Sequence, residues 1–165
     1  MRVEKGFTLV EILIVVVILG ILAAIVIPQF TSASTEASES ALVSDLQAIR
    51  SQIELYKIHH MDNLPGTQAT NDFVTAMTNK TNIDGETATQ AADPATCRYG
   101  PYMREIPINP FNKINTVSEG ATMISGQGDN TTGWHFVNAG QDAGLFQPND
   151  DKANPLDDTD WHTGY

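Results

Sequence analysis

Two sets of acidic side chains in this sequence could do chemistry, and the first is a single glutamate in an apolar segment. Glu11 is the fifth residue of a long apolar run that begins at Phe7. A carboxylate at the centre of a membrane-spanning helix costs about 2.5–3.5 kcal/mol, so its presence needs a reason. One explanation is that Glu11, roughly 6 Å along the axis from Phe7, reaches the membrane interface. The other is that it pairs with a buried cation.

The second set lies near the C-terminal end of the sequence, where aspartates are dense. Calcium prefers carboxylate and backbone carbonyl oxygens in a flexible loop, so this cluster is a candidate calcium site. A solvated acidic tail that binds nothing has the same composition, and it remains the alternative interpretation. The candidate calcium ligands are Asp142, Asp150, Asp151, Asp157, Asp158 and Asp160.

The composition excludes several classes of function. Twenty acidic and 9 basic side chains among 165 residues give a formal net charge of -11, which excludes a nucleic-acid binder that depends on overall positive charge. The single cysteine, Cys97, cannot form an intramolecular disulfide. The sequence has no phosphate-binding loop, nucleophile elbow or paired-cysteine metal motif. We therefore expect no enzymatic activity, no nucleic-acid partner and no cofactor other than calcium.

The apolar run that contains Glu11 is long enough to cross a membrane. The segment from Phe7 to Ile27 has 21 residues, which as a helix reach roughly 30 Å, the thickness of the hydrocarbon core. The positively charged residues Arg2 and Lys5 before it should stay in the cytoplasm, so residues after Phe30 cross the membrane. The run is too long for an ordinary secretory signal peptide cut near residues 31–33. A plain membrane anchor and a specialised leader both remain open.

The segment Lys5–Glu11, with the sequence KGFTLVE, resembles the signal of type IV prepilins and type II secretion pseudopilins. The resemblance implies that a prepilin peptidase cuts after Gly6 and methylates the new amino group of Phe7. It also implies that Glu11 neutralises the Phe7 amine of a neighbouring subunit and fixes the register of assembly. In similar filaments the helix loosens between a glycine and a proline, which correspond here to Gly20 and Pro28.

Helical periodicity continues beyond the apolar run. Leu42, Leu46, Ile49, Ile53 and Tyr56 recur at spacings of four and three, which predicts one apolar helix face. We expect a single helix from about residue 7 to about residue 59. The adjacent pair His59 and His60 would lie at the end of this helix, near its negative dipole, rather than share a metal ion.

The remainder predicts a small domain on this helix. Apolar bursts at Thr122–Ser125, Trp134–Val137 and Leu145–Phe146 alternate with glycine-rich segments, which predicts an antiparallel meander. The predicted fold class is therefore α+β: a long N-terminal helix, with a membrane half and an amphipathic half, packed against a small antiparallel β-meander in a pilin-like fold. Asn71 or Asp72 should cap a short helix that follows.

A proline-rich segment from Tyr99 to Phe111 resembles the Gly-Pro-Tyr segment that precedes the sheet in major pseudopilins of type II secretion. We expect the apolar side chains of this segment to pack against the long helix. They are Tyr99, Tyr102, Ile106, Ile108 and Phe111. Major pseudopilins are similar also in holding a structural calcium near the sheet, although the acidic tail here does not match theirs residue by residue.

Together these features predict a type II secretion pseudopilus subunit that assembles with copies of itself. Expected partners are the prepilin peptidase, an inner-membrane assembly platform, minor pseudopilins and the membrane. The expected organisation is a leader (1–6), a transmembrane or filament-core helix (7–30) and a periplasmic domain (31–165), with a single pass through the bacterial inner membrane. The alternatives are a type IV pilin of a surface pilus and, more remotely, a membrane-anchored binding domain that never polymerises.

Overall fold

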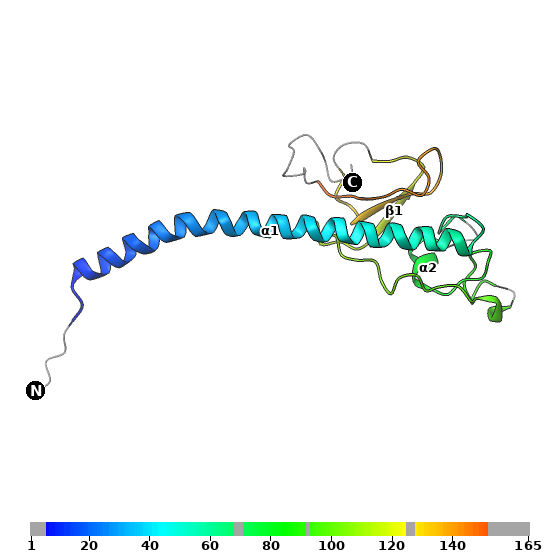
Figure 1. Ribbon diagram of the computed structural model, residues 1–165, viewed down its shortest axis with the longest axis horizontal. Coiled ribbons are helices and arrows are strands. Elements are labelled where there is room, and N and C mark those ends of the chain that lie inside the picture. The colour runs from blue at the N-terminus through cyan, green and yellow to red at the C-terminus, as the bar shows by residue number, and fades with distance from the viewer. Residues whose placement is uncertain (1–5, 68–70, 92, 125–127, 152–165) are drawn as a thin grey trace, which may run out of the picture. The chain divides into compact units, whose positions relative to one another are not determined.

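The longest element is a single α-helix, α1, from Leu9 to His59 (Figure 1). The computed structural model describes residues 6–67, 71–91, 93–124 and 128–151. By its internal contacts the chain separates into two compact units, residues 1–39 and 40–165. The further elements are helix α2 (Phe73–Thr78), the 3-10 turn η1 (Pro94–Thr96) and strands β1 (Val117–Gly120), β2 (Trp134–Val137) and β3 (Phe146–Pro148).

The C-terminal part of α1 contributes one buried face to the hydrophobic core of the second unit. The predicted apolar face is confirmed, because its five side chains are at most 2% exposed. Arg50 lies beside this face and donates from Nε and Nη2 to the carbonyl oxygen of Phe146, at 3.2 and 2.9 Å. The helix thus buries one side against the domain and also binds the backbone of β3. The buried face comprises Leu42, Leu46, Ile49, Ile53 and Tyr56.

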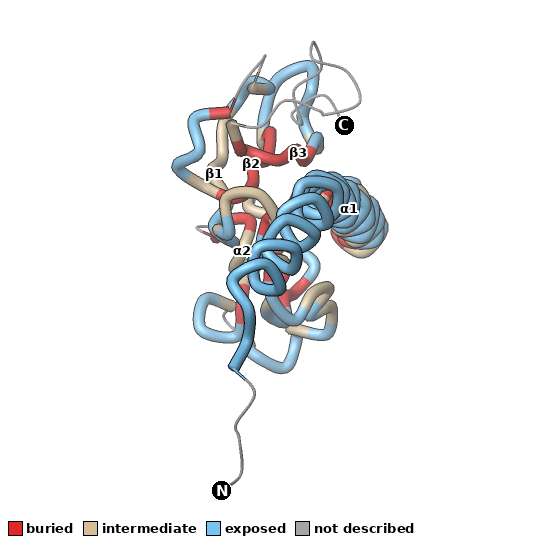
Figure 2. The backbone as a smooth tube through the Cα atoms, turned by 90° about the vertical axis from the view of Figure 1, so that its left-hand side faces the viewer, coloured by how far each residue is buried: buried red, intermediate tan, exposed pale blue. Residues whose placement is uncertain are grey.

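Three short strands form the sheet that completes this core. Strand β2 lies in the centre and β1 and β3 flank it. Every residue of β2 and β3 is buried, as Figure 2 shows. Trp134, Phe136 and Phe146 belong to the same apolar cluster as the buried face of α1 and Phe73 of α2. The α+β fold with a long N-terminal helix is therefore confirmed.

The predicted arrangement of the strands is wrong in two respects. Strand β1 is parallel to β2, so the sheet is mixed rather than an antiparallel meander, whereas β3 is antiparallel as expected. The connection through residues 121–133 is long enough for the chain to return and start β2 in the same direction, which a tight hairpin would prevent. The first strand is Val117–Gly120 and not Thr122–Ser125. The carbonyl oxygen of Thr122 instead accepts a hydrogen bond from His135 Nε2 at 3.0 Å.

The proline-rich segment after residue 99 packs into the domain largely as predicted. The backbone N–H groups of Tyr102 and Met103 both donate to the carbonyl oxygen of Met77 at the end of α2, at 2.9 and 3.0 Å. Ile106 is only 4% exposed and belongs to the core. Ile108, however, is 58% exposed, so its predicted packing is wrong. Only Pro107 lies between these two isoleucines, and they nevertheless differ because no helix or strand among the described residues covers Ile108.

The short helix α2 begins as the sequence predicts. Asp72 is its N-cap, and Asp72 Oδ1 accepts a hydrogen bond from the backbone N–H of Thr75 at 2.7 Å. The backbone N–H of Phe73 donates to Glu119 Oε1 of β1 at 2.7 Å. Because both carboxylates accept from otherwise unpaired N–H groups of the first turn, they fix the helix where Phe73 enters the core.

The packing of α1 predicts different outcomes for two isoleucines on the same helix. Ile53 is 1% exposed and Ile58 is 77% exposed. Ile53→Ala should lower the free energy of unfolding by about 2–5 kcal/mol, because it leaves a cavity in the core. Ile58→Ala, the matched control, should change it by less than about 0.5 kcal/mol. Urea unfolding of the full chain in detergent, followed by tryptophan fluorescence, measures both, and equal losses would contradict this packing.

Candidate processing and assembly site

Thr8 and Glu11 form a capping box at the start of α1. Glu11 Oε2 accepts hydrogen bonds from the backbone N–H and the hydroxyl group of Thr8, both at 2.9 Å. Thr8 Oγ1 in turn accepts from the backbone N–H of Glu11 at 3.3 Å. These contacts satisfy two N–H groups that have no partner inside the helix, which explains why α1 begins at Leu9.

The sequence analysis did not predict that Glu11 caps the helix of its own chain. The signal was present, since a threonine three residues before a glutamate at the head of an apolar run is typical of a capping box. In the described part of the chain, Glu11 Oε1 has no hydrogen bond, because Thr8 uses only Oε2. The carboxylate can therefore hold the cap with one oxygen and offer the other to a cation from outside the chain.

The Gly6–Phe7 peptide bond lies immediately before this capping box and is accessible. Phe7 is 84% exposed. A Cβ atom added at Gly6 would meet no atom within 4 Å. The fold of this chain therefore does not require glycine at position 6. If glycine is needed there, the need arises from a protein that binds this segment and not from folding.

The helix that follows is apolar on all sides and uncovered. Every large apolar side chain from Phe7 to Phe30 is more than half exposed. Figure 2 draws this part of α1 in the pale blue of exposed residues. Among the described residues, α1 is the one helix long and apolar enough to cross a membrane; its most apolar window has a mean hydropathy of 3.3. Exposing so many large side chains to water is unfavourable by about 1.5–3 kcal/mol for each. This surface requires a lipid or protein cover.

Gly20 and Pro28 lie within this uncovered segment, and α1 continues through both without interruption. A Cβ at Gly20 would meet no atom within 4 Å, so no contact in this chain requires glycine there. The carbonyl oxygen of Pro28 accepts from the hydroxyl groups of Thr31 and Ser32, at 2.9 and 3.2 Å. Pro28 itself has no N–H, so one backbone carbonyl in the preceding turn lacks its helical donor.

The acidic candidates near the C-terminal end do not converge in the part of the chain that the structure describes. Asp142 is exposed, Asp151 is partly buried, and Asp150 is 1% exposed. Asn109 donates from Nδ2 to Asp150 Oδ2 at 2.9 Å. No group of three potential metal-binding side chains exists among the described residues. Asp157, Asp158 and Asp160 lie outside them.

A different aspartate, Asp129, accepts several hydrogen bonds near this end, and the sequence analysis did not single it out. Asp129 Oδ1 accepts from Thr131 N–H, from the Thr131 hydroxyl at 2.7 Å and from Asn149 Nδ2 at 2.7 Å. The two bonds from Thr131 are the main cause that lowers the pKa of Asp129. The turn signal Asp-Asn-Thr-Thr could have suggested this role, which fixes the loop before β2.

Comparison with known proteins places the N-terminal segment in a known family. Residues 1–27 match the family described as prokaryotic N-terminal methylation motif. The chain is 31% identical over 147 residues to type II secretion system core protein G of Aeromonas hydrophila, covering 82% of this chain and 95% of that protein. The protein of the same name from Pseudomonas aeruginosa is 35% identical over 112 residues, 67% of this chain and 70% of that protein.

The protein of the same name from Vibrio cholerae is 32% identical over 111 residues, 67% of this chain and 68% of that protein. No solved structure is significantly similar to this chain. These relatives support the pseudopilin interpretation over the type IV pilin alternative. With its methylation motif, its exposed apolar helix and this similarity, the chain belongs to the family of type II secretion system core protein G, the major pseudopilins.

Proposed function

We propose that this chain is cut after Gly6, methylated on the Phe7 amino group and assembled with copies of itself into a pseudopilus that serves protein secretion. The observation that carries the proposal is the position of an accessible Gly6–Phe7 bond directly before a helical segment, up to Phe30, whose large apolar side chains are all more than half exposed. The membrane covers this surface before assembly, and neighbouring helices cover it afterwards. The role of the protein is structural, and its chemistry is that of its own processing.

The orientation in the membrane follows from the charge around the helix. Arg2 and Lys5 precede the apolar run, whereas the residues after Phe30 are predominantly polar. Positive residues are retained on the cytoplasmic side, so residues 31–165 face the periplasm and residues 7–30 anchor the chain in the inner membrane. The prepilin peptidase, an inner-membrane assembly platform and minor pseudopilins are the proposed partners in processing and growth of the filament.

Glu11 supplies the pairing that sets the subunit register. After cleavage, the amine of Phe7 is a cation at the start of an apolar helix. A buried cation and a buried carboxylate are each costly alone, and they become tolerable as a hydrogen-bonded pair. Glu11 Oε1 is available for this pair while Oε2 stays on Thr8. A neighbouring subunit docked at the wrong height leaves both charges unpaired, which disfavours that register by several kcal/mol.

The helix between Gly20 and Pro28 loosens when subunits pack. Glycine lowers helix propensity by about 1 kcal/mol relative to alanine, and proline removes one backbone hydrogen bond. Neither residue has a tertiary contact that would stabilise a straight helix, since the side chains of this segment are exposed. Local unwinding lets the apolar segment adapt to its neighbours at little cost.

Calcium binding by the acidic tail remains a separate proposal. The described carboxylates do not make a cation site by themselves, because Asp142 and Asp150 are not gathered with a third ligand and Asp150 already accepts from Asn109. A site therefore needs oxygens from Asp157, Asp158 and Asp160, or from backbone carbonyls. The chain has no intramolecular disulfide, so a bound cation would stabilise this region.

Processing can be tested directly by mass spectrometry of the protein from its native cells. We expect a mature chain that begins at N-methylated Phe7 and lacks residues 1–6. Gly6→Val should block cleavage and leave the unfolding midpoint unchanged, because a Cβ added at Gly6 would meet no atom within 4 Å. Gly20→Ala is the matched control and should be processed normally. A chain that begins near Ser34, or an uncut Met1, would show that the protein is a secreted or anchored domain.

Three substitutions at the helix start separate charge pairing from capping. Glu11→Ala should abolish filament assembly and leave membrane insertion intact. Glu11→Gln should abolish assembly too, because glutamine keeps a capping box but cannot neutralise the amine. Thr8→Val, which removes the cap and keeps the charge, should assemble at least partly. Electron microscopy of filaments measures assembly, and normal filaments from Glu11→Gln would show that capping, and not charge, is the function of this residue.

Calcium binding can be tested by thermal unfolding of the full chain in detergent. Chelation with EGTA should lower Tm by about 2–4 °C for each kcal/mol that calcium contributes. Replacing Asp157, Asp158 and Asp160 together by asparagine should remove the EGTA effect, whereas Asp93→Asn, an exposed acid elsewhere, should retain it. An unchanged Tm after chelation of the unsubstituted protein would eliminate the calcium proposal.

A further inference from the structure

Two adjacent histidines at the end of α1 both contact the hydroxyl group of one tyrosine, although neighbouring side chains on a helix point in different directions. His59 is in the last turn of α1, and His60 follows the helix. The hydroxyl group of Tyr102 lies 3.0 Å from His59 Nδ1 and 3.2 Å from His60 Nε2. His60 is 0% exposed, and processing and assembly as proposed above use neither histidine.

The partners of His60 determine which ring nitrogen carries the proton. His60 Nδ1 lies 3.1 Å from the carbonyl oxygen of Ile83, which can only accept, so Nδ1 carries the hydrogen. In the neutral ring Nε2 is then an acceptor. It faces two hydroxyl groups that can donate, those of Tyr102 and Thr81, each at 3.2 Å. Neutral His60 therefore has both ring nitrogens satisfied in a buried position.

Aromatic rings close the remaining space around His60. The ring of Tyr56 stacks on it with a centroid distance of 3.9 Å and an interplanar angle of 22°. The rings of Tyr99 and Tyr102 meet it edge-on, at 5.4 and 6.1 Å. Burial raises the pKa of Tyr56 to about 12, so this phenol stays neutral through the physiological range.

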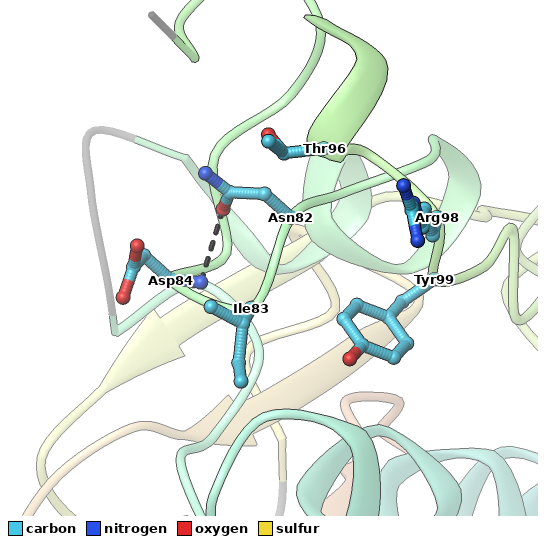
Figure 3. A pocket seen from close by; sticks show the side chains of 6 residues that line it. All are labelled: Asn82, Ile83, Asp84, Thr96, Arg98 and Tyr99. Atoms are coloured by element: carbon cyan, nitrogen blue, oxygen red, sulfur yellow. Dashed lines mark hydrogen bonds between the residues drawn. The ribbon is translucent and has the colours of Figure 1, made fainter. Parts of the chain in front are cut away.

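The contacts of His60 connect two other segments to the end of α1. Residues 81–83 and residues 99–102 are already joined, because Thr81 and Tyr99 exchange backbone hydrogen bonds at 2.9 and 3.1 Å. These segments border a cavity of about 340 Å³ (Figure 3). Its lining comes from these segments and the residues next to them, namely Asn82, Ile83 and Asp84 on one side and Thr96, Arg98 and Tyr99 on the other. His60 is the side chain through which both are hydrogen-bonded to the helix end.

A positive charge on His60 would be poorly compensated. The groups that face it are His59 and Tyr56 from α1, Asp84 from the 81–86 loop, and Tyr99 and Tyr102 from the proline-rich segment. Burial is the main cause that lowers the pKa of His60; a charged His59 lowers it further, and Asp84 and the Ile83 carbonyl oppose the shift only in part. The described salt bridges involve Lys57 with Glu54 and Asp62, and not His60.

The sign of the pH effect follows from this lowered pKa. An unfolded chain binds a proton at His60 near its ordinary value of about 6.5, whereas the folded chain does so only at lower pH. The stabilisation is therefore fully present above about pH 6.5 and is lost as the pH falls below it.

We propose that His60 is a pH-sensitive contact between the end of α1 and two neighbouring segments. When His60 is neutral it holds residues 81–83 and 99–102 on the end of α1, and when it is protonated it releases them. Tyr56 is the residue of the buried face of α1 that stacks on His60, whereas the sheet and the part of that face from Leu42 to Ile53 stay packed. The cavity shown in Figure 3 and the surface around it then change with the pH of the compartment that the domain faces.

Hydrogen exchange of the full chain in detergent, read by mass spectrometry at about pH 7.5 and about pH 5, tests this proposal. After correction for the intrinsic pH dependence of exchange, peptides within residues 80–103 should exchange more than about twofold faster at the lower pH. Peptides that cover β2 and β3 should not change. His60→Gln, whose amide can donate to Ile83 and accept from Tyr102 but does not titrate, should lose the pH effect.

The matched control is His135→Gln, which replaces another buried histidine in β2 and should retain the pH effect. An equal pH effect in His60→Gln, or no effect in the unsubstituted protein, would overturn the proposal. If His60→Gln fails to fold, NMR titration of the histidine rings in the unsubstituted protein decides. The midpoint for loss of protection must then coincide with protonation of His60, and coincidence with His59 or with carboxylates refutes the role of His60.

Discussion

The uncovered apolar surface of residues 7–30 is the constraint on which the behaviour of this protein depends. Apolar side chains on every side of a helix cannot all be buried by one small domain, and here each large one is more than half exposed. The chain therefore has a stable state only with lipid or other helices around this segment. The last third of α1 has a different pattern, with apolar residues on one face, and that face is buried by its own domain. One helix thus satisfies two different requirements.

Glu11 is compatible with this apolar segment because its position limits the cost of its charge. It stands in the first turn of α1, where backbone N–H groups have no helical partner and favour a carboxylate. Thr8 uses one oxygen of the carboxylate for the cap. The other oxygen and the negative charge are available for the pairing proposed above. A residue that only capped the helix could equally be glutamine, so the charge is the informative property.

The domain compensates for its small core and its missing disulfide with buried polar side chains that bind backbone groups of distant segments. Asn109, 0% exposed, donates from Nδ2 to the Gly133 carbonyl and to Asp150, and accepts from the backbone of Phe111. Asn71 donates to the Gly85 carbonyl at 2.6 Å. His60 belongs to the same class of contact, with the difference that it titrates. Loss of such a side chain leaves a buried carbonyl unsatisfied, at a cost of about 1–3 kcal/mol.

The sequence by itself determined the features that depend on local order and periodicity. The apolar run, the glutamate at its head, the buried face of α1 and a cap at Asn71 or Asp72 all depend on residues close together in the sequence, so spacing alone predicts them. The structure selects Asp72 as the cap. The family and the processing signal are also contained in contiguous residues, and comparison with relatives supports both.

Tertiary structure decided what depends on contacts between distant residues. The parallel direction of β1, the exposure of Ile108 and the lack, among the described residues, of a three-ligand group around Asp142 or Asp150 follow from how loops return to the core, which residue spacing does not encode. The meeting of His59 and His60 at Tyr102 is of the same kind, since helical geometry directs the two rings apart and only the returning segment joins them. The physical reason is that loop paths are set by packing and hydrogen-bond satisfaction across the whole domain, whereas helix faces are set by the backbone repeat.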